Sequence, residues 1–339
     1  MKKYIALLLT LTLLATIFVG CGKKPTETPA NSSETPANSS EALVGTTTWP
    51  EKPITVIIPY NPGGDTDFNA RAYLEYLSAD LGVAVVATNV AGSSGTIASR
   101  QVKDAANDGY TVLFSHTAMN VNEMVGIAEF GMDAFEISCI AARSPGEIIA
   151  VRSDLGVKTL DELKAYTEAH PGELDLAIDF GTMVNINGIQ MQKEGFDVNL
   201  ITAGSASERV AALAGGHCDI IINGFGSVKD YLATGEFVAL GTIGTEQAEG
   251  FNGIPTALEQ GYDINLDKHY FFAFPKGTPT EIVEKFAASV EKASQNADYQ
   301  AAIMTAYAQE PFYASPKDGL ALMQDAKDKI WSFKADMAG

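Results

Sequence analysis

Histidine, cysteine and clustered positive charge are scarce in this chain, and each scarcity excludes a class of function. The 339 residues include four histidines and three cysteines, and 23 basic side chains stand against 42 acidic ones. No basic cluster follows Lys24, which disfavours nucleic-acid binding because phosphate neutralisation needs grouped Lys and Arg. The histidines are too scattered for a metal site, and no Gly-x-Ser-x-Gly turn is present. We therefore expect no metal, no cofactor and no catalytic residue.

A single cysteine stands in the first hundred residues, at the end of an apolar stretch. Lys2 and Lys3 precede an uncharged run that continues to Gly20 and is too short to span a bilayer comfortably. Val19-Gly20-Cys21 then predicts cleavage after a signal peptide of residues 1–20 and lipidation of Cys21, whose acyl chains would bind the bilayer. A plain secretory signal and an uncleaved anchor are the alternatives.

Residues 21–48 are predicted to form a disordered tether. The heptapeptide ETPANSS covers 27–33 and is repeated in 34–40, and this composition cannot bury enough apolar area to fold. The folded part begins near Trp49. Its length suits two lobes better than one core.

An α/β fold with parallel layers is predicted from runs of β-branched residues that alternate with amphipathic helices. The predicted strands are 54–59, 83–88, 111–115, 136–142, 147–152, 174–179, 198–202, 219–223, 237–243 and 270–275. An apolar stripe predicts a helix over 69–81 with Asp67 as its N-cap. Ser205-x-x-Glu208 predicts a capping box at the start of another helix.

Two buried strands stand where a middle segment would be inserted into the first lobe. This spacing predicts one lobe from 49–148 plus 270–339 and a second lobe from 149–269. Cys139 and Cys218 lie inside apolar strand-like runs, and we expect both to be buried free thiols.

Two glycine-containing loops follow predicted strands, where open α/β sheets bind ligands. They are residues 59–67, Pro-Tyr-Asn-Pro-Gly-Gly-Asp-Thr-Asp, and residues 91–96, Ala-Gly-Ser-Ser-Gly-Thr. Paired glycines let backbone amides turn toward a helix N-terminus, which can hold a carboxylate or a phosphate without Lys or Arg. Neither loop has the spacing of a P-loop or of a dinucleotide-binding turn.

These loops belong to a longer set of motifs that resembles one family of solute receptors. The motifs are Trp49-Pro50-x-Lys52-Pro53-Ile54-Thr55-Val56-Ile57-Ile58-Pro59-Tyr60-x-Pro62-Gly63-Gly64-x-x-Asp67, Ala91 to Thr96, Asn107 to Leu113, Lys158 to Leu163, Pro171-Gly172, Ile254-Pro255-Thr256-Ala257-x-Glu259-x-Gly261-Tyr262 and Pro275-x-Gly277-Thr278-Pro279. Together they resemble the receptors of tripartite tricarboxylate transporters, the Bug family, over nearly all of the folded part.

The resemblance implies a two-lobed, type II-like periplasmic-binding-protein fold with the ligand in a cleft between the lobes. It implies a small organic acid as ligand, held by backbone amides and ordered waters of the two loops, and the transporter's membrane subunits as partners. We expect a monomer. The candidate ligand-binding residues are Tyr60, Pro62, Gly63, Gly64, Asp65, Thr66, Asp67, Gly92, Ser93, Ser94, Gly95, Thr96, His116, Asp179, Gly181, Thr182, Ala203, Gly204 and Asn223. His116 ends a strand near the expected cleft, although a satisfied surface histidine is the simpler interpretation.

The second lobe departs from the family pattern. Asp179-Phe180-Gly181-Thr182 replaces a Gly-Asn-Gly-Ser/Thr stretch, Thr202-Ala203-Gly204 replaces Tyr-Lys-Gly, and Asn223 replaces an aspartate. Asp65 and Asp179 are unexpected negative charges near an anion site. They cap helices or face solvent, or else they contact a cationic or hydroxylated end of the ligand.

Two other functions are compatible with the sequence. One is a binding protein of the same fold that serves an amino-acid ABC importer or a sensor. The other is an anchored hydrolase, because a Ser/His/Asp triad is assembled in space rather than in sequence.

We predict that replacing Cys21 with Ser releases the protein from the membrane or leaves its signal peptide uncleaved, because the thioether that carries the lipid cannot form. Membrane fractionation and mass spectrometry of the N-terminus measure both outcomes. Normal cleavage together with unchanged membrane retention would contradict the lipidation hypothesis.

Overall fold

The computed structural model describes residues 48–251 and 253–338. The chain divides into two units, 1–45 and 46–339. The predicted signal peptide, Cys21 and nearly all of the tether lie outside the described residues, so the description concerns the second unit. None of the helices in the described residues combines the length and the apolar character needed to cross a membrane.

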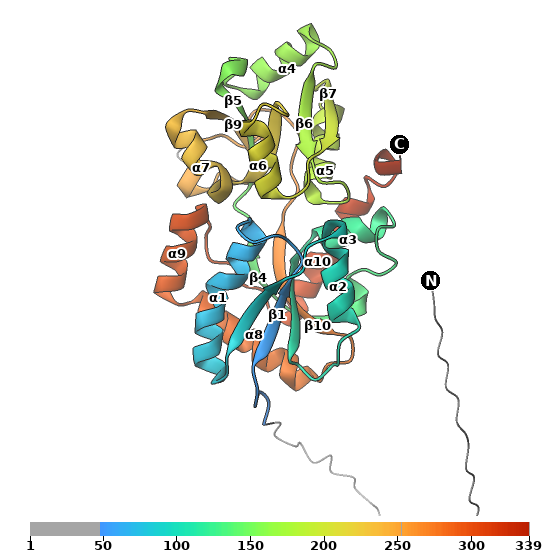
Figure 1. Ribbon diagram of the computed structural model, residues 1–339, viewed down its shortest axis with the longest axis vertical. Coiled ribbons are helices and arrows are strands. Elements are labelled where there is room, and N and C mark those ends of the chain that lie inside the picture. The colour runs from blue at the N-terminus through green and yellow to red at the C-terminus, as the bar shows by residue number, and fades with distance from the viewer. Residues whose placement is uncertain (1–47, 252, 339) are drawn as a thin grey trace, which may run out of the picture. The chain divides into compact units, whose positions relative to one another are not determined.

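Two five-stranded sheets, each covered by helices, form the folded unit (Figure 1). The first has the order β2-β1-β3-β10-β4 and the second has the order β7-β6-β8-β5-β9. The strands are β1 Ile54–Ile58, β2 Val85–Asn89, β3 Thr111–His116, β4 Phe135–Arg143, β5 Glu147–Arg152, β6 Leu174–Ile178, β7 Val198–Thr202, β8 Ile220–Gly224, β9 Phe237–Ile243 and β10 His269–Pro275. All ten predicted strands are confirmed, with ends displaced by two residues at most.

The two sheets share one plan. In the first, β1 pairs in parallel with β2 and β3, and β10 then runs antiparallel between β3 and β4. In the second, β6 pairs in parallel with β7 and β8, and β5 runs antiparallel between β8 and β9. The α/β class is confirmed. In both sheets the parallel strands direct their carboxyl ends, and the loops that follow, to one edge.

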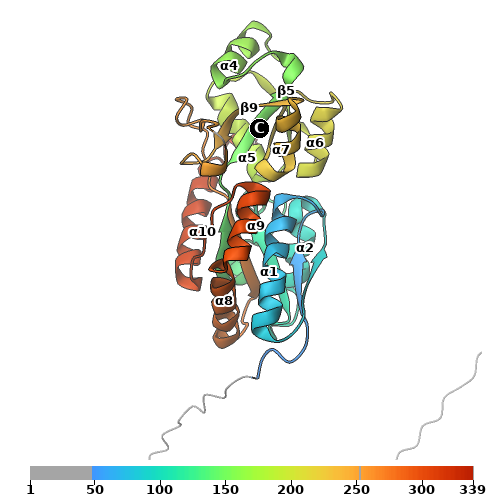
Figure 2. The ribbon, with the colours of Figure 1, turned by 90° about the vertical axis from the view of Figure 1, so that its left-hand side faces the viewer.

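Helices cover both faces of the first sheet, as Figure 2 shows. Successive side chains of β1 point to opposite faces of the sheet. Val56 packs with α1, α8 and α9 on one face, whereas Ile57 packs with α2, α3 and α10 on the other. The helices are α1 Asp65–Leu81, α2 Thr96–Lys103, α3 Ala118–Met124, α4 Leu160–Ala169, α5 Met183–Lys193, α6 Ala206–Ala214, α7 Phe225–Thr234, α8 Thr280–Ser294, α9 Ala297–Tyr307 and α10 Pro316–Trp331.

The chain passes between the sheets twice, and the two passages are bonded to each other. It leaves β4 and enters β5 through residues 144–146, and it returns from β9 to β10 through residues 244–268. The Ser144 amide donates to the Lys268 carbonyl at 2.9 Å. The second sheet already includes residues 147 and 148, which we had assigned to the first lobe. Whether the two lobes move as bodies with the predicted boundaries stays a prediction.

The C-terminal helix makes a further link between the two sheets. Ile330 of α10 packs in one apolar cluster with Met183 and Ile186 of α5, which lies beside the second sheet. The Lys329 ammonium donates to Asn265 Oδ1 at 2.6 Å in the returning passage. The end of α10 therefore contacts the lobe that does not contain its own sheet.

Local details confirm three sequence predictions and correct one. Cys139 and Cys218 are buried free thiols, and the Glu208 carboxylate caps α6 by accepting from the Ser205 amide at 2.7 Å. The predicted N-cap of α1 is wrong, because the helix begins at Asp65 after Gly64. Asp67 lies inside the first turn, where its carboxylate binds side chains and the preceding loop.

We predict that replacing Tyr73 with Phe lowers the free energy of unfolding by about 1–2 kcal/mol, because it leaves a buried carbonyl without a donor. The Tyr73 hydroxyl, on α1, donates to the Ala141 carbonyl of β4 inside the core. Denaturant unfolding with an unchanged m-value measures the loss. Tyr76→Phe, one turn further along α1 and only partly buried, is the control and should change stability by less than about 0.5 kcal/mol.

Candidate functional site

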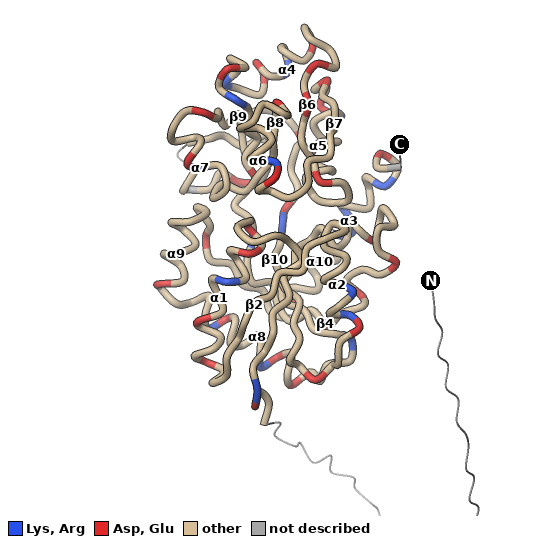
Figure 3. Tube along the Cα trace, viewed as in Figure 1, with Lys and Arg blue, Asp and Glu red and all other residues tan. Residues whose placement is uncertain are grey.

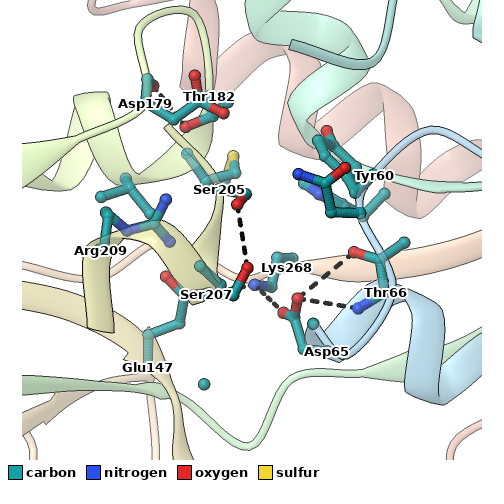
Figure 4. Close-up of a pocket in the computed structure, with 17 residues that line it drawn as sticks. Tyr60, Asp65, Thr66, Glu147, Asp179, Thr182, Ser205, Ser207, Arg209 and Lys268 are labelled. Carbon is teal, nitrogen blue, oxygen red and sulfur yellow. Dashed lines mark hydrogen bonds and ion pairs between the residues drawn. The ribbon is translucent and has the colours of Figure 1, made fainter. Parts of the chain in front are cut away.

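One pocket lies where strand ends of the two sheets face each other. It encloses about 600 Å³, part of which is open to solvent. Its wall is formed by Tyr60, Asn61, Gly64, Asp65, Thr66, His116, Glu147, Asp179, Thr182, Met183, Val184, Ser205, Ala206, Ser207, Arg209, Gly224 and Lys268. Figure 4 shows Arg209, Asp179 and Ser205 of the second lobe opposite Tyr60, Asp65 and Thr66 of the first. A molecule in this space would therefore contact both lobes at once.

His116 and Tyr60 form an aromatic side of the wall. Their rings stack with centroids 5.0 Å apart at 16°. Burial, assisted by the charge of Lys268, lowers the pKa of His116 to about 3, so the ring is neutral at neutral pH. Its Nδ1 accepts the Ala118 amide at 3.2 Å, which places the proton on Nε2. The interpretation of His116 as a surface residue is wrong, since 7% of it is exposed.

Backbone amides at and just before the start of α1 donate to the carboxylates of Asp65 and Asp67. Asp65 accepts the Thr66 amide at 2.8 Å, and Asp67 accepts the Gly63 amide at 3.1 Å. Asp67 also accepts from Arg71 Nε and from Asn89 Nδ2, each at 2.8 Å. Two of the amides that the family resemblance assigns to a ligand are therefore already occupied.

Lys268 lies between two carboxylates that come from different sheets. Its ammonium pairs with Asp65 at 2.5 Å and with Glu147, the first residue of β5. The Tyr270 hydroxyl donates to the same Asp65 oxygen at 2.5 Å. Burial alone would raise the pKa of Asp65, but Lys268, His116 and this hydroxyl hold it well below its usual value. The two carboxylates in turn raise the pKa of Lys268 against its burial.

This ion triad, defined as Asp65, Lys268 and Glu147, carries a net negative charge. Lys268 is 7% exposed and Glu147 is 6% exposed. Within the described part of the chain, Glu147 Oε2 is buried and has no hydrogen-bond partner. Because buried charges are costly unless they are paired, Lys268 serves first as the counter-ion of these two carboxylates, which take up two of its three N–H groups.

Arg209 is the other cation of the pocket, and it has no anionic partner. It lies on α6, and 5% of it is exposed. Its Nε donates to Asn223 Oδ1 at 2.9 Å and its Nη1 to the Gly204 carbonyl at 2.7 Å. No carboxylate of the described residues lies within 4.0 Å of the guanidinium. Burial lowers the pKa of Arg209, but a guanidinium keeps its charge at neutral pH.

Asp179 follows β6 on the same side of the pocket. Burial raises the pKa of its carboxyl group, and Arg209 acts in the opposite direction. Its one side-chain contact is the Ser94 hydroxyl, at 3.5 Å from Oδ1. That hydroxyl also donates to the Phe180 carbonyl at 2.7 Å. The loop at 92–96 thus contacts the second lobe beside the pocket rather than forming its wall.

The structure brings together only part of the predicted site. The predicted residues in the wall are Tyr60, Gly64, Asp65, Thr66, His116, Asp179 and Thr182. The predicted residues outside it are Pro62, Gly63, Asp67, Gly92, Ser93, Ser94, Gly95, Thr96, Gly181, Ala203, Gly204 and Asn223. Gly204 and Asn223 still act on the wall, because both accept hydrogen bonds from Arg209. The role of each residue toward a ligand stays a prediction.

Sequence reasoning missed Glu147, Lys268 and Arg209, which are the charged residues that dominate the pocket. A signal existed for the first two. Glu147 opens the run Glu-Ile-Ile-Ala-Val, and Lys268 directly precedes the apolar strand β10. A charge at the end of a buried strand needs a partner, and that requirement could have marked both.

We predict that replacing Lys268 with Met destabilises the fold by about 3–5 kcal/mol at pH 7, because the buried Glu147 and the largely buried Asp65 carboxylates lose their cation. In the parent, the lowered pKa of Asp65 adds stability above pH 4 that is lost as the pH falls further. In the variant the pKa of Asp65 rises, so its protonation relieves the repulsion between the two carboxylates and the deficit shrinks as the pH falls from about 7 toward 4.

Unfolding free energies measured across this range test the sign of the effect. Lys276→Met is the matched control, since Lys276 lies just beyond the other end of β10 with its side chain 61% exposed. A deficit for Lys268→Met that is small or independent of pH would contradict the role given to the triad.

Comparison with known proteins identifies the family. The tripartite tricarboxylate transporter family receptor matches residues 69–333. The protein BugT of Bordetella pertussis is 27% identical over 295 residues, which is 84% of this chain and 89% of BugT. A solved R. palustris protein with adipate has a TM-score of 0.80 at 24% identity, over 86% of this chain and 98% of that one. MatC from Rhodopseudomonas palustris with bound malate has a TM-score of 0.75 at 23% identity, over 86% and 100%.

These likenesses confirm the expected two-lobed periplasmic-binding-protein fold. The family match covers most of the described residues, including every charged residue of the pocket wall except Asp65. The chain therefore belongs to the tripartite tricarboxylate transporter receptor family, a family of solute-binding receptors, as its motifs predicted.

Proposed function

We propose that this chain is an extracytoplasmic receptor that captures a small organic carboxylate and delivers it to the membrane subunits of a tripartite tricarboxylate-type transporter. The observation that carries the proposal is Arg209, a buried guanidinium in the pocket wall without a carboxylate partner. The family supports the receptor role. Adipate and malate in two solved proteins of this fold support the ligand class.

Free donors on Arg209 suit a carboxylate. A guanidinium has five N–H groups, and Arg209 uses two of them on Asn223 and Gly204. A third, on Nη2, donates to the Ile222 carbonyl in a long bond of 3.5 Å, which leaves two N–H groups free. A carboxylate can accept two parallel bonds from such a group, and it would neutralise a charge that is costly to bury alone. The ligand thus supplies the counter-ion that the fold omits.

Ligand capture is proposed to close the two lobes, 49–148 with 270–339 and 149–269. The pocket wall draws on both, and Ser94 of the first lobe bonds Phe180 of the second beside it. The paired passages at 144–146 and 244–268 would serve as the hinge. No catalytic step is proposed, and the described residues hold no group of three or more His, Cys, Asp or Glu that could bind a metal.

The location and partners complete the proposal. The Val19-Gly20-Cys21 motif supports a receptor held on the membrane by the lipidated Cys21, with residues 21–48 as the tether. Such an anchor keeps the binding unit near the transporter's membrane subunits. We propose that the receptor acts as a monomer.

We predict that replacing Arg209 with Gln weakens carboxylate binding about 10- to 100-fold, because it removes a charge-assisted hydrogen-bond pair. Isothermal titration with succinate, malate, adipate and citrate measures the affinities. Small-angle scattering in the same titrations should show a more compact protein on binding.

Arg152→Gln is the matched control and should bind as the parent does. Arg152 ends β5 at the strand's far end from Glu147, and it pairs with Asp154 and Asp219 outside the pocket. Melting temperatures show whether each variant is folded, and Arg209→Lys tests whether charge alone suffices. Equal affinities of the folded Arg209→Gln variant and the parent would place the ligand elsewhere.

A further inference from the structure

Asp179 is a carboxylate in the pocket wall that lacks a cationic partner. Within the described residues no Lys, Arg or His nitrogen lies within 4.0 Å of it, and its one contact is a long hydrogen bond from Ser94. It nonetheless lies near enough to Arg209 for each charge to influence the other's titration. The second lobe therefore presents two unpaired charges of opposite sign to one cavity.

The remaining charges of the pocket form no ion pair with either of these two within the described residues. The charge of Lys268 is already balanced by Asp65 and Glu147. Glu147 also acts on Arg209, although it lies beyond 4.0 Å from the guanidinium. Three carboxylates, Asp65, Glu147 and Asp179, thus face two cations, Lys268 and Arg209, so the wall is net negative around Asp179.

This distribution of charge discriminates between ligand classes. A dicarboxylate can place one group on Arg209, but its second negative charge would enter a wall lined by Asp179 and Glu147, where like charges repel. A ligand with one carboxylate and one ammonium group satisfies both unpaired charges. A hydroxyl could donate to Asp179 as well, but only an ammonium group also neutralises its charge, which is costly to leave unpaired away from water.

We propose that the receptor recognises a zwitterion, a small amino acid whose carboxylate binds Arg209 and whose ammonium group binds Asp179. This inference rests on the proposed function, since it takes carboxylate capture in this pocket as given. In this proposal Asp179 determines specificity, because it favours amino acids over organic acids that lack an ammonium group.

Two matched ligand sets test the proposal with the intact folded unit. Propionate, L-lactate and L-alanine differ only in carrying a hydrogen, a hydroxyl or an ammonium group on the second carbon, and so do succinate, L-malate and L-aspartate. We expect the ammonium compound of at least one set to bind the parent at least about tenfold more tightly than the hydroxyl compound. In Asp179→Asn this preference should fall below about twofold.

Glu173→Gln is the control, because Glu173 is exposed and immediately precedes β6, at the opposite end from Asp179. It removes one negative charge from the same lobe and should leave the ammonium preference unchanged. Melting temperatures of both variants establish that they are folded.

Each other outcome has a defined meaning. Arg209-dependent binding with no ammonium preference, or a preference that persists in Asp179→Asn, overturns the zwitterion and leaves carboxylate capture standing. Absence of binding by all six compounds and by the four acids titrated with Arg209→Gln contradicts the proposed function and, with it, this inference.

Discussion

The pairing of Lys268 with Asp65 and Glu147 is the interaction on which the pocket depends. Asp65 begins a helix packed on the first sheet, Glu147 begins a strand of the second sheet, and Lys268 lies on the passage that returns between the sheets. Three charges that are each costly to bury become tolerable only in this arrangement. The contact therefore fixes the relative position of the elements that carry the rest of the wall, including the neutral His116.

In the proposed function, an acidic protein holds an anion by local geometry rather than by its overall charge. The formal net charge of the chain is −19. Exposed charges are screened over about 8 Å at physiological salt, whereas a buried guanidinium acts at contact distance in a medium of low polarity. The helix N-termini contribute less than the family resemblance suggested, because Asp65, Asp67 and Glu208 already accept their amides or those of the preceding loop.

The sequence was informative where structure is local. Every strand was predicted because runs of β-branched residues between turn signals need no distant partner to be recognised. The loop at 59–67 was correctly placed at the pocket, since a strand-to-helix turn in an α/β sheet points to one edge. The loop at 92–96 obeyed the same rule, yet it contacts the rim of the opposite lobe instead. That contact joins residues 86 positions apart in the chain, and no local pattern encodes it.

The ion pairs of the pocket and the burial of Arg209 were not predicted from the sequence for a related reason. Asp65 and Lys268 are about 200 positions apart, and their partnership exists only because β10 runs antiparallel beside β3. Arg209 occupies a helix whose capping box was recognised, but its burial depends on Asn223 and Ile222 of β8 beneath it. A sequence shows that these residues are charged. Only the packing shows which of them lack a counter-ion.

The hydrogen bonds that hold Arg209 to Asn223 and Gly204 have a kinetic consequence. An arginine side chain loses about 2 kcal/mol of rotamer entropy when it is fixed in one conformation. Because backbone and amide acceptors already fix this one, that loss occurs when the chain folds and not when a ligand arrives. In the proposed function, the guanidinium therefore meets each ligand already held in one conformation, and we expect affinities to differ mainly in how long each solute stays bound.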